Sequence, residues 1–210
     1  MKKDYIADVS EIIEQARLGK MLIMVDEEQR ENEGDMMIPG QFTSPDAINF
    51  MIRHGSGIIC LALTQARANF LNLRPLPKFN SGANQPNFAT PVDARCGVTT
   101  GVSAFDRSHT IAALTNPNTT REDIVSPGHI FTLIAKEGGV LERPGHTEAG
   151  VEIAKLAGLS PAMVICEVLN EDGTMARGPE LSKFAKRHSI KICYISSLIK
   201  YLETKEKCFS

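Results

Sequence analysis

The sequence lacks several features that mark common classes of protein. Its five cysteines are odd in number and include no CxxC pair, which argues against a disulfide framework or a zinc knuckle. No apolar run approaches the length of a membrane span, and the first ten residues lack the apolar core of a signal peptide. We therefore expect a soluble, cytoplasmic protein that has no membrane partner.

An excess of charge of one sign is missing as well. The chain has 23 Lys and Arg against 25 Asp and Glu, so its net charge of -2 creates no overall field that favours nucleic acid. With 210 residues, 42% hydrophobic content and no linker-like change in composition, the sequence predicts one domain over residues 1–210. We expect a small molecule or another protein as its partner.

Helix and strand signals alternate along the chain without an internal repeat or strict βαβ order. Helices are predicted after Asp8 and up to Gly19, from Ser44 to Gly55, over 65–73, after Asp106, and over 147–157, 179–188 and 197–203. Strands are predicted over 21–25, 36–38, 57–63, 129–135, 162–169 and 190–195, with a hairpin at 137–139 and a long loop over 74–90. This mixture predicts a three-layer α+β domain with a mixed sheet.

The densest chemical feature is the acidic stretch DEEQRENEGD at residues 26–35, which contains a single arginine, Arg30. Its carboxylates belong to Asp26, Glu27, Glu28, Glu31, Glu33 and Asp35. The apolar runs on both sides predict two neighbouring strands, so the stretch should be the loop that joins them. Crowded carboxylates repel one another unless a cation neutralises them, and oxygen ligands suit a hard divalent ion such as magnesium. A solvated hairpin tip is the alternative.

A second feature is the segment Arg143-Pro144-Gly145-His146-Thr147 at the start of a predicted helix. Free backbone amides and the helix dipole favour an anion there, and Arg143 and Thr147 add donors, so the segment can bind a phosphate group. An ordinary helix cap after a turn is the alternative. His146 can reach a metal in the acidic loop if the strand order brings the two together.

Two further residues are candidates for proton transfer. Glu167 interrupts an apolar strand, where burial would disfavour the charged carboxylate, as a general acid or base requires. A salt bridge to a Lys or Arg would explain this carboxylate as well. His129 follows Pro127-Gly128 at a strand entrance, where its imidazole can move protons or form a structural hydrogen bond.

Five motifs occur in the order found in a known enzyme family. They are RENEGD at 30–35, HGSGIIC at 54–60, GVTTGVSAFDR at 97–107, PGH at 127–129 and RPGHTEA at 143–149. The chain resembles the 3,4-dihydroxy-2-butanone 4-phosphate synthase family of riboflavin biosynthesis over about residues 12–201. Nothing remains for the GTP cyclohydrolase II domain that some relatives carry, so we expect the monofunctional form.

The resemblance implies conversion of D-ribulose 5-phosphate into L-3,4-dihydroxy-2-butanone 4-phosphate and formate through an enediolate, a skeletal rearrangement and loss of C4. It implies Mg²⁺ with Mn²⁺ as the alternative, two ions per site, and a homodimer whose sites draw on both subunits. Glu31 and His146 match the metal ligands, and His129 and Glu167 match the catalytic positions. The substrate contacts implied are Arg30, Glu31, Asp35, Arg143, Pro144, Gly145, His146, Thr147 and Glu167, with Glu33, Cys60, Arg107 and Thr110 in motifs that line the site. The implied fold is a three-layer α/β/α sandwich around a mixed twisted sheet.

Some positions depart from the family pattern without removing a proposed ligand or catalytic group. Ser126 stands where an Arg commonly precedes PGH, Thr132 replaces a frequent Pro, and Pro91 and Cys96 alter the segment before GVTTG. Two other classes fit less well. An RNA-binding module of the similarly folded threonylcarbamoyl-transfer family would show a basic groove, and a calcium-binding protein gives no role to Arg143, His146 or Glu167.

Overall fold

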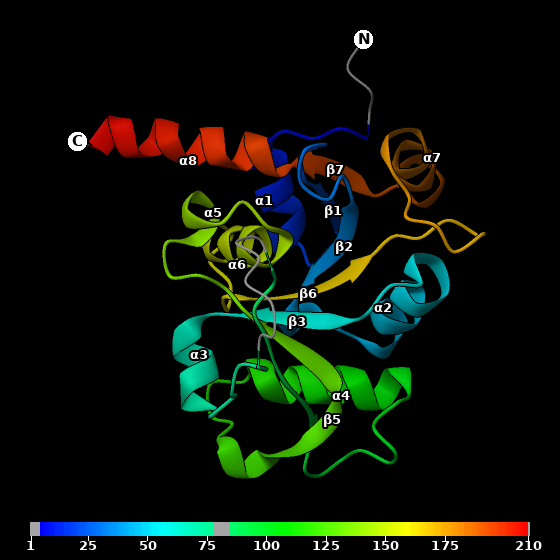
Figure 1. The fold of residues 1–210 in the computed structure, drawn as a ribbon, viewed down its shortest axis with the longest axis vertical. Coiled ribbons are helices and arrows are strands. Elements are labelled where there is room, and N and C mark those ends of the chain that lie inside the picture. Colours follow the sequence, from blue (N-terminus) through cyan, green and yellow to red (C-terminus); the bar gives the residue numbers. More distant parts are fainter. Residues whose placement is uncertain (1–4, 78–84, 210) are drawn as a thin grey trace.

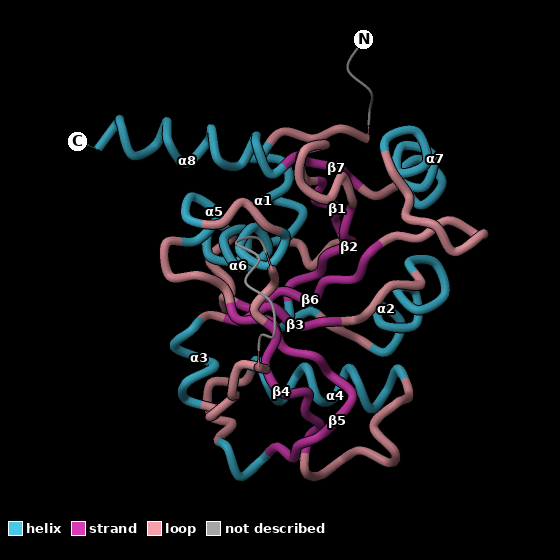
Figure 2. The backbone as a smooth tube through the Cα atoms, viewed as in Figure 1, coloured by secondary structure: helices cyan, strands magenta, loops and turns pink. Residues whose placement is uncertain are grey.

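A mixed sheet with seven strands crosses the computed structural model, which describes residues 5–77 and 85–209. Its strands are β1 Leu22–Val25, β2 Gly34–Pro39, β3 Cys60–Leu63, β4 Phe88–Ala94, β5 Ile124–Ile134, β6 Ala162–Glu167 and β7 Lys191–Tyr194. They lie side by side in the order β4-β5-β3-β6-β2-β1-β7. In the view of Figure 2, β4 and β5 lie at the bottom of the sheet and β7 lies at the top, as β5 and β7 do in Figure 1. The pairs β1–β7 and β3–β5 are parallel, and the other four are antiparallel.

Helices cover both faces of this sheet because successive strand residues enter two separate cores. Leu22 and Met24 belong to one core, whereas Ile23 and Val25 belong to the other. The first core is covered by α1 Val9–Arg17, α5 Gly139–Glu142, α6 His146–Leu156 and α8 Ile195–Phe209. The second core is covered by α2 Pro45–Phe50, α3 Gln65–Phe70, α4 Ala104–Thr115 and α7 Gly178–His188. The expected α+β fold, a three-layer α/β/α sandwich around a mixed sheet, is confirmed.

Local capping signals place several helices where the sequence predicts them. The Asp8 side chain accepts a hydrogen bond from the amide of Glu11 at 2.9 Å, and Gly19, with a φ of +67°, follows the end of α1. Ser44 accepts a hydrogen bond from the amide of Ala47 at 3.1 Å and caps α2 in the same way. Within the described part of the chain, no helix is long and apolar enough to cross a membrane.

Two predictions about the chain between these helices are wrong. The predicted loop over 74–90 contains the start of β4, and its residues 78–84 lie outside the described part of the chain. This strand contains Pro91, which is tolerated because β4 is the edge strand and its pairing with β5 is irregular. The expected hairpin at 137–139 is the entry to α5, because Gly139 has a φ of +62° and Val140 is buried in a core.

Two boundaries near the site also differ from the prediction. Ser103 rather than Asp106 caps α4, because its side chain accepts a hydrogen bond from the amide of Asp106 at 3.0 Å. The strand expected over 57–63 begins at Cys60, and the amide of Ile58 bonds to a side chain of β6 instead of entering a strand ladder. Both differences arise from side chains that hold the backbone near the candidate site.

Candidate active site

The acidic loop between β1 and β2 is folded around the buried carboxylate of Asp26. Its Oδ2 accepts hydrogen bonds from Nη1 of Arg30 at 2.8 Å and from the amide of Glu31 at 3.1 Å. Its Oδ1 accepts one from the amide of Glu33 at 2.8 Å, and only 1% of the Asp26 side chain is exposed. A loop built in this way is not a solvated hairpin tip. The sequence did not single out Asp26 among the six carboxylates.

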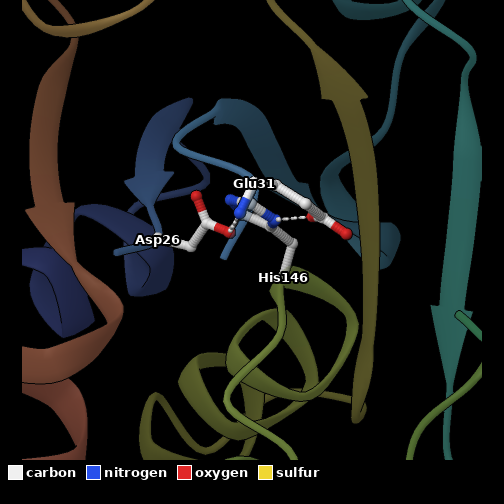
Figure 3. Close-up of side chains that lie close together, drawn as sticks. All are labelled: Asp26, Glu31 and His146. Carbon is white, nitrogen blue, oxygen red and sulfur yellow. Dashed lines mark hydrogen bonds and ion pairs between the residues drawn. The ribbon is translucent and has the colours of Figure 1, made fainter. Parts of the chain in front are cut away.

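His146, the first residue of α6, meets this loop (Figure 3). Its Nδ1 lies 3.8 Å from Oε2 of Glu31 and 3.8 Å from Oδ2 of Asp35. One ligand atom from each of Asp26, Glu31 and His146 lies within 4.8 Å of the others. The Nε2 of His146 is buried and has no hydrogen-bond partner among the described residues. Carboxylate oxygens beside an imidazole form a donor set that fits a divalent ion.

Burial and neighbouring charges set the protonation of this cluster. Burial raises the pKa of Asp35 to about 7; His146 opposes this rise, and the carboxylates of Glu167 and Glu31 add to it. Burial lowers the pKa of His146, but Asp35 and Glu31 outweigh this effect and raise it to about 9. The neighbouring imidazole of His146 lowers the pKa of Glu31. A protonated imidazole therefore balances the carboxylates, and a divalent ion can take over this role.

Glu167 ends β6 directly opposite Asp35 of β2. Its Oε2 accepts a hydrogen bond from the amide of Ile58 at 2.7 Å, which fixes the carboxylate beside the entrance of β3. A Cβ at Gly57 would collide with the backbone and carboxylate of Glu167, so this close approach requires glycine. None of the ion pairs in the described part of the chain includes Glu167, so a structural salt bridge does not explain this carboxylate there.

Residues 143–147 form the turn that leads into α6 and the first two residues of that helix. Nη1 of Arg143 donates a hydrogen bond to Oε2 of Glu148 at 2.6 Å, and both side chains are buried. Oε1 of Glu148 accepts another from the amide of Lys136 at 3.1 Å, so this carboxylate ties the turn to the chain after β5. Gly145 is the N-cap residue of α6 and provides no side-chain hydrogen bond, so α6 does not begin with the ordinary side-chain cap that was the alternative for this segment. The first amides of α6 therefore suit an anion.

His129 lies on β5 in contact with Asp93 of β4. Its ring Nδ1 is 2.7 Å from Oδ2 of Asp93, and its amide donates to Oδ1 of the same carboxylate at 2.9 Å. Cys60 pairs with Phe131 on β5 and with Ile165 on β6, so His129 and Glu167 lie at the same end of the sheet. Two strand spacings separate them, about 10 Å. No hydrogen bond or ion pair of the described residues joins His129 to the acidic cluster.

Three more predicted site residues lie on β3 or close to His146 in the chain. Cys60 is buried on β3, and burial together with the nearby carboxylates raises the pKa of its thiol, which keeps it uncharged. Pro144 is exposed and lies in the turn before His146, whereas Thr147 is buried and follows His146 in α6. These positions fit a site whose floor is formed by the sheet and whose rim is formed by the start of α6.

Two further predicted site residues, Arg107 and Thr110, come from an element that carries none of the acidic cluster. Both lie on α4, which covers the second core. The Thr110 hydroxyl accepts a hydrogen bond from the amide of Ala94 at 3.0 Å and so joins α4 to β4, and burial lowers the pKa of Arg107. In the described part of the chain, neither side chain has a hydrogen bond or ion pair with the cluster, so their assignment stays a prediction.

Comparison with known proteins matches most of the chain to one family. The family model of 3,4-dihydroxy-2-butanone 4-phosphate synthase matches residues 10–201. The 3,4-dihydroxy-2-butanone 4-phosphate synthase of Neisseria meningitidis serogroup A is 48% identical over 202 residues, which cover 96% of this chain and 56% of that protein. The riboflavin biosynthesis protein RibBA of Aquifex aeolicus is 50% identical over 200 residues, which cover 94% and 49%. The chain spans about half the length of these curated relatives.

A solved structure agrees over nearly the whole of both chains. The crystal structure of a 3,4-dihydroxy-2-butanone 4-phosphate synthase in complex with two magnesium ions has a TM-score of 0.90 to this chain. It is 35% identical, and the match covers 96% of this chain and 99% of that one. Because a family model matches residues 10–201 and a relative of similar length shares the fold, this chain belongs to the 3,4-dihydroxy-2-butanone 4-phosphate synthase family.

Proposed function

We propose that this chain converts D-ribulose 5-phosphate into L-3,4-dihydroxy-2-butanone 4-phosphate and formate, a step of riboflavin biosynthesis. Membership of the family supports the reaction. One observation carries the proposal for this chain. The acidic loop and α6 are far apart in the sequence, yet Asp26 and Glu31 of the loop and His146 of α6 have ligand atoms within 4.8 Å of one another.

A divalent ion is the cofactor that this cluster fits. We assign Glu31 and His146 as its ligands, whereas Asp26 keeps the loop in shape through its hydrogen bonds. Magnesium suits the carboxylate oxygens, and manganese is the alternative because it accepts a histidine ligand at least as well. The relative that was solved with two magnesium ions supports two ions per site. When bound, the ion polarises the oxygens of the sugar and makes the neighbouring carbon more acidic.

The phosphate group of the substrate belongs at the start of α6. Its open amides, the Arg143 guanidinium and the Thr147 hydroxyl favour a dianion, which they would hold away from the reacting carbons. Glu148 supports this role because it fixes Arg143 by a buried ion pair of 2.6 Å. We assign Arg30 and Asp35 to the sugar hydroxyls, since both border the ion site.

The reaction needs acids and bases on more than one side of the sugar, because a proton leaves C3, the C1 hydroxyl departs and C4 is expelled as formate. Glu167 is oriented by the amide of Ile58, and His129 is oriented by Asp93. We assign proton transfer to these two side chains. Their places at the end of the sheet where the acidic cluster lies support the assignment.

A homodimer is the second part of the proposal. His129 lies about 10 Å from Glu167 by strand spacing, so a second copy can bring its own His129 closer to the acidic cluster than this chain does. Large apolar side chains near the same end of the sheet support such contact, because Ile58, Val102 and Phe105 are 55%, 53% and 72% exposed. Exposed apolar groups of this size are stabilised by burial against a partner.

The remaining expectations concern the chain as a whole. We propose a single domain over residues 1–210, because one sheet with a core on each face runs through the described residues. The net charge of -2 supports a small-molecule substrate rather than nucleic acid. The described cysteines, Cys60, Cys96, Cys166 and Cys193, are free thiols, which supports a reducing cytoplasm.

The carbon that leaves distinguishes this reaction from related ones. Ribulose 5-phosphate labelled with carbon-13 at C4 should give labelled formate by NMR, together with a four-carbon phosphate that retains C1, C2, C3 and C5. An isomerase would instead produce xylulose or ribose 5-phosphate, and a retro-aldol enzyme would break the C3–C4 bond and produce dihydroxyacetone and glycolaldehyde phosphate. Unlabelled formate from this substrate, together with labelled formate from ribulose 5-phosphate labelled at C1, would refute the proposed rearrangement.

A further inference from the structure

Asp93 on β4 holds His129 on β5 with both oxygens of one carboxylate. Oδ1 accepts a hydrogen bond from the amide of His129 at 2.9 Å, and Oδ2 lies 2.7 Å from its ring Nδ1. The Asp93 side chain is 10% exposed, whereas the His129 side chain is 44% exposed. The carboxylate is therefore inside the protein, the imidazole reaches the surface, and Nε2 lies on the side of the ring away from Asp93.

We propose that Asp93 is a positioning residue that orients the His129 ring and keeps its proton on Nδ1. An ionised carboxylate can only accept hydrogen bonds, so Nδ1 must be the donor. In the neutral imidazole, Nε2 then carries the lone pair that can take a proton. Exchange of this proton between Nε2 and the sugar rests on the proposed function, whereas the pairing of Asp93 with the ring does not.

The contact between Asp93 and His129 requires glycine at two neighbouring positions, because a side chain there would collide with the pair or its backbone. A Cβ at Gly101 would collide with the Asp93 carboxylate and the His129 ring, and the φ of Gly101 is +87°. A Cβ at Gly128 would collide with the backbone of Val92 and Asp93, so glycine lets β5 approach β4 at this point. The GVTTG and PGH motifs therefore both serve the Asp93–His129 pair.

The Asp93→Asn variant tests the effect of Asp93 on the orientation of the His129 ring separately from its effect on packing. Asparagine keeps the shape of aspartate but has one acceptor oxygen fewer. If that oxygen still accepts from the His129 amide, the NH₂ group faces Nδ1 and must donate to it. The ring proton then moves to Nε2, which can no longer act as a base. The opposite orientation is disfavoured, because the NH₂ group would then face the His129 amide, two donors with no acceptor between them.

The test compares the native protein with Asp93→Asn and with Asp123→Asn as a matched control. Asp123 also accepts a hydrogen bond from a backbone amide, that of Thr120 at 2.7 Å, and it does not contact His129. ¹⁵N NMR of labelled histidine reports the tautomer, and a His129→Gln spectrum identifies the signal. We expect the Nδ1–H form in the native protein and the control, and the Nε2–H form in Asp93→Asn. Its turnover should fall roughly 10² to 10⁴-fold at nearly unchanged KM.

Two results would overturn the inference: an Nδ1–H tautomer in folded Asp93→Asn, or a changed tautomer with near-normal turnover. If the native protein does not act on ribulose 5-phosphate, the proposed function fails, and the tautomer comparison still decides the role of Asp93. If Asp93→Asn does not fold, Gly101→Ala replaces it, because its methyl group would push the ring from the carboxylate. An unchanged His129 signal and turnover in that variant would also overturn the inference.

Discussion

At the scale of single residues, one buried carboxylate, that of Asp26, determines how the other carboxylates of the acidic loop are arranged. Asp26 accepts hydrogen bonds from Arg30 and from two amides of the loop, so its own charge is compensated within the loop. Glu31 and Asp35 are then left facing His146, each 3.8 Å from its Nδ1. Repulsion among the carboxylates of this loop is thus reduced by the hydrogen-bond donors around Asp26 and by the positive charge beside Glu31 and Asp35, which a protonated His146 or a divalent ion provides.

Glu31→Gln should reduce activity to background without unfolding the protein. The amide loses the charge that binds a divalent ion, while the side chain is already 40% exposed and contributes little to the core. Circular dichroism and an activity assay with magnesium or manganese check the two halves of this expectation. Metal-stripped native protein should also be inactive, and full turnover in excess chelator would exclude the metal assignment.

His129→Ala and Glu167→Gln should each lower turnover by roughly 10² to 10⁴-fold, the usual contribution of a positioned proton-transfer group. Substrate binding should change less, because neither side chain belongs to the phosphate or metal contacts proposed above. Steady-state kinetics at saturating substrate separates the two quantities. Near-normal turnover of either variant would leave that residue with a structural role only.

The sequence predicts some site residues better than others for a physical reason. Glu31 and His146 stand in specific motifs, so their roles can be inferred without a fold. Asp93 and Glu148 matter because they are buried against groups from other elements, and Asp26 matters because it turns inward and holds its own loop together. A run of six carboxylates does not reveal which one turns inward, and a lone Asp or Glu in a strand or helix gives no signal of its partner.

At the scale of elements, the loop before α4 is organised by Asp106. Its Oδ1 accepts a hydrogen bond from the Thr99 amide at 3.1 Å, and its Oδ2 accepts from the Thr99 hydroxyl at 2.7 Å and the Gly101 amide at 3.0 Å. The same loop places Gly101 against the Asp93–His129 pair. One carboxylate at the start of a helix therefore fixes a loop that covers a candidate catalytic group.

Asp106→Asn should lower the midpoint of thermal unfolding at neutral pH. The hydrogen bonds from Thr99 and Gly101 hold the pKa of Asp106 below its usual value of 3.8. A depressed pKa means that the carboxylate contributes stability above the unfolded-state value and loses this contribution as the pH falls through the folded-state value. The difference between native and variant should be constant from pH 8 to about 4 and shrink below that. A difference that persists unchanged at lower pH would exclude this charge effect.

Element prediction fails where tertiary contacts override local signals. The helices with side-chain caps at Asp8 and Ser44 are predicted correctly because the caps act within a few residues. The strand β4 is missed because Pro91 is typical of loops and is tolerated only at a sheet edge. The helix α5 is mistaken for a hairpin because the glycines before it are typical of turns in both structures.

At the scale of the molecule, strand order creates the site. The strand β2 lies between β1 and β6, so the acidic loop, Asp35 and Glu167 meet at one end of the sheet, and α6 adds His146 from the face above. Motifs can identify these residues, but periodicity cannot give the order of seven strands, because the pairing depends on contacts across the whole chain. The register also shows that His129 is two strands away from Glu167.

The whole-molecule prediction is that two inactive variants restore activity when they share a dimer. If one site combines the acidic cluster of one copy with His129 of the other, a mixed dimer of Glu31→Gln and His129→Ala has one intact site. Random pairing makes half of the dimers mixed, so co-expressed variants should show about one quarter of native turnover. Glu31→Gln with Asp35→Asn is the control, since both changes lie in one cluster and no intact site can form. Light scattering should report a dimer, and a stable, active monomer or a mixture as inactive as the control would refute shared sites.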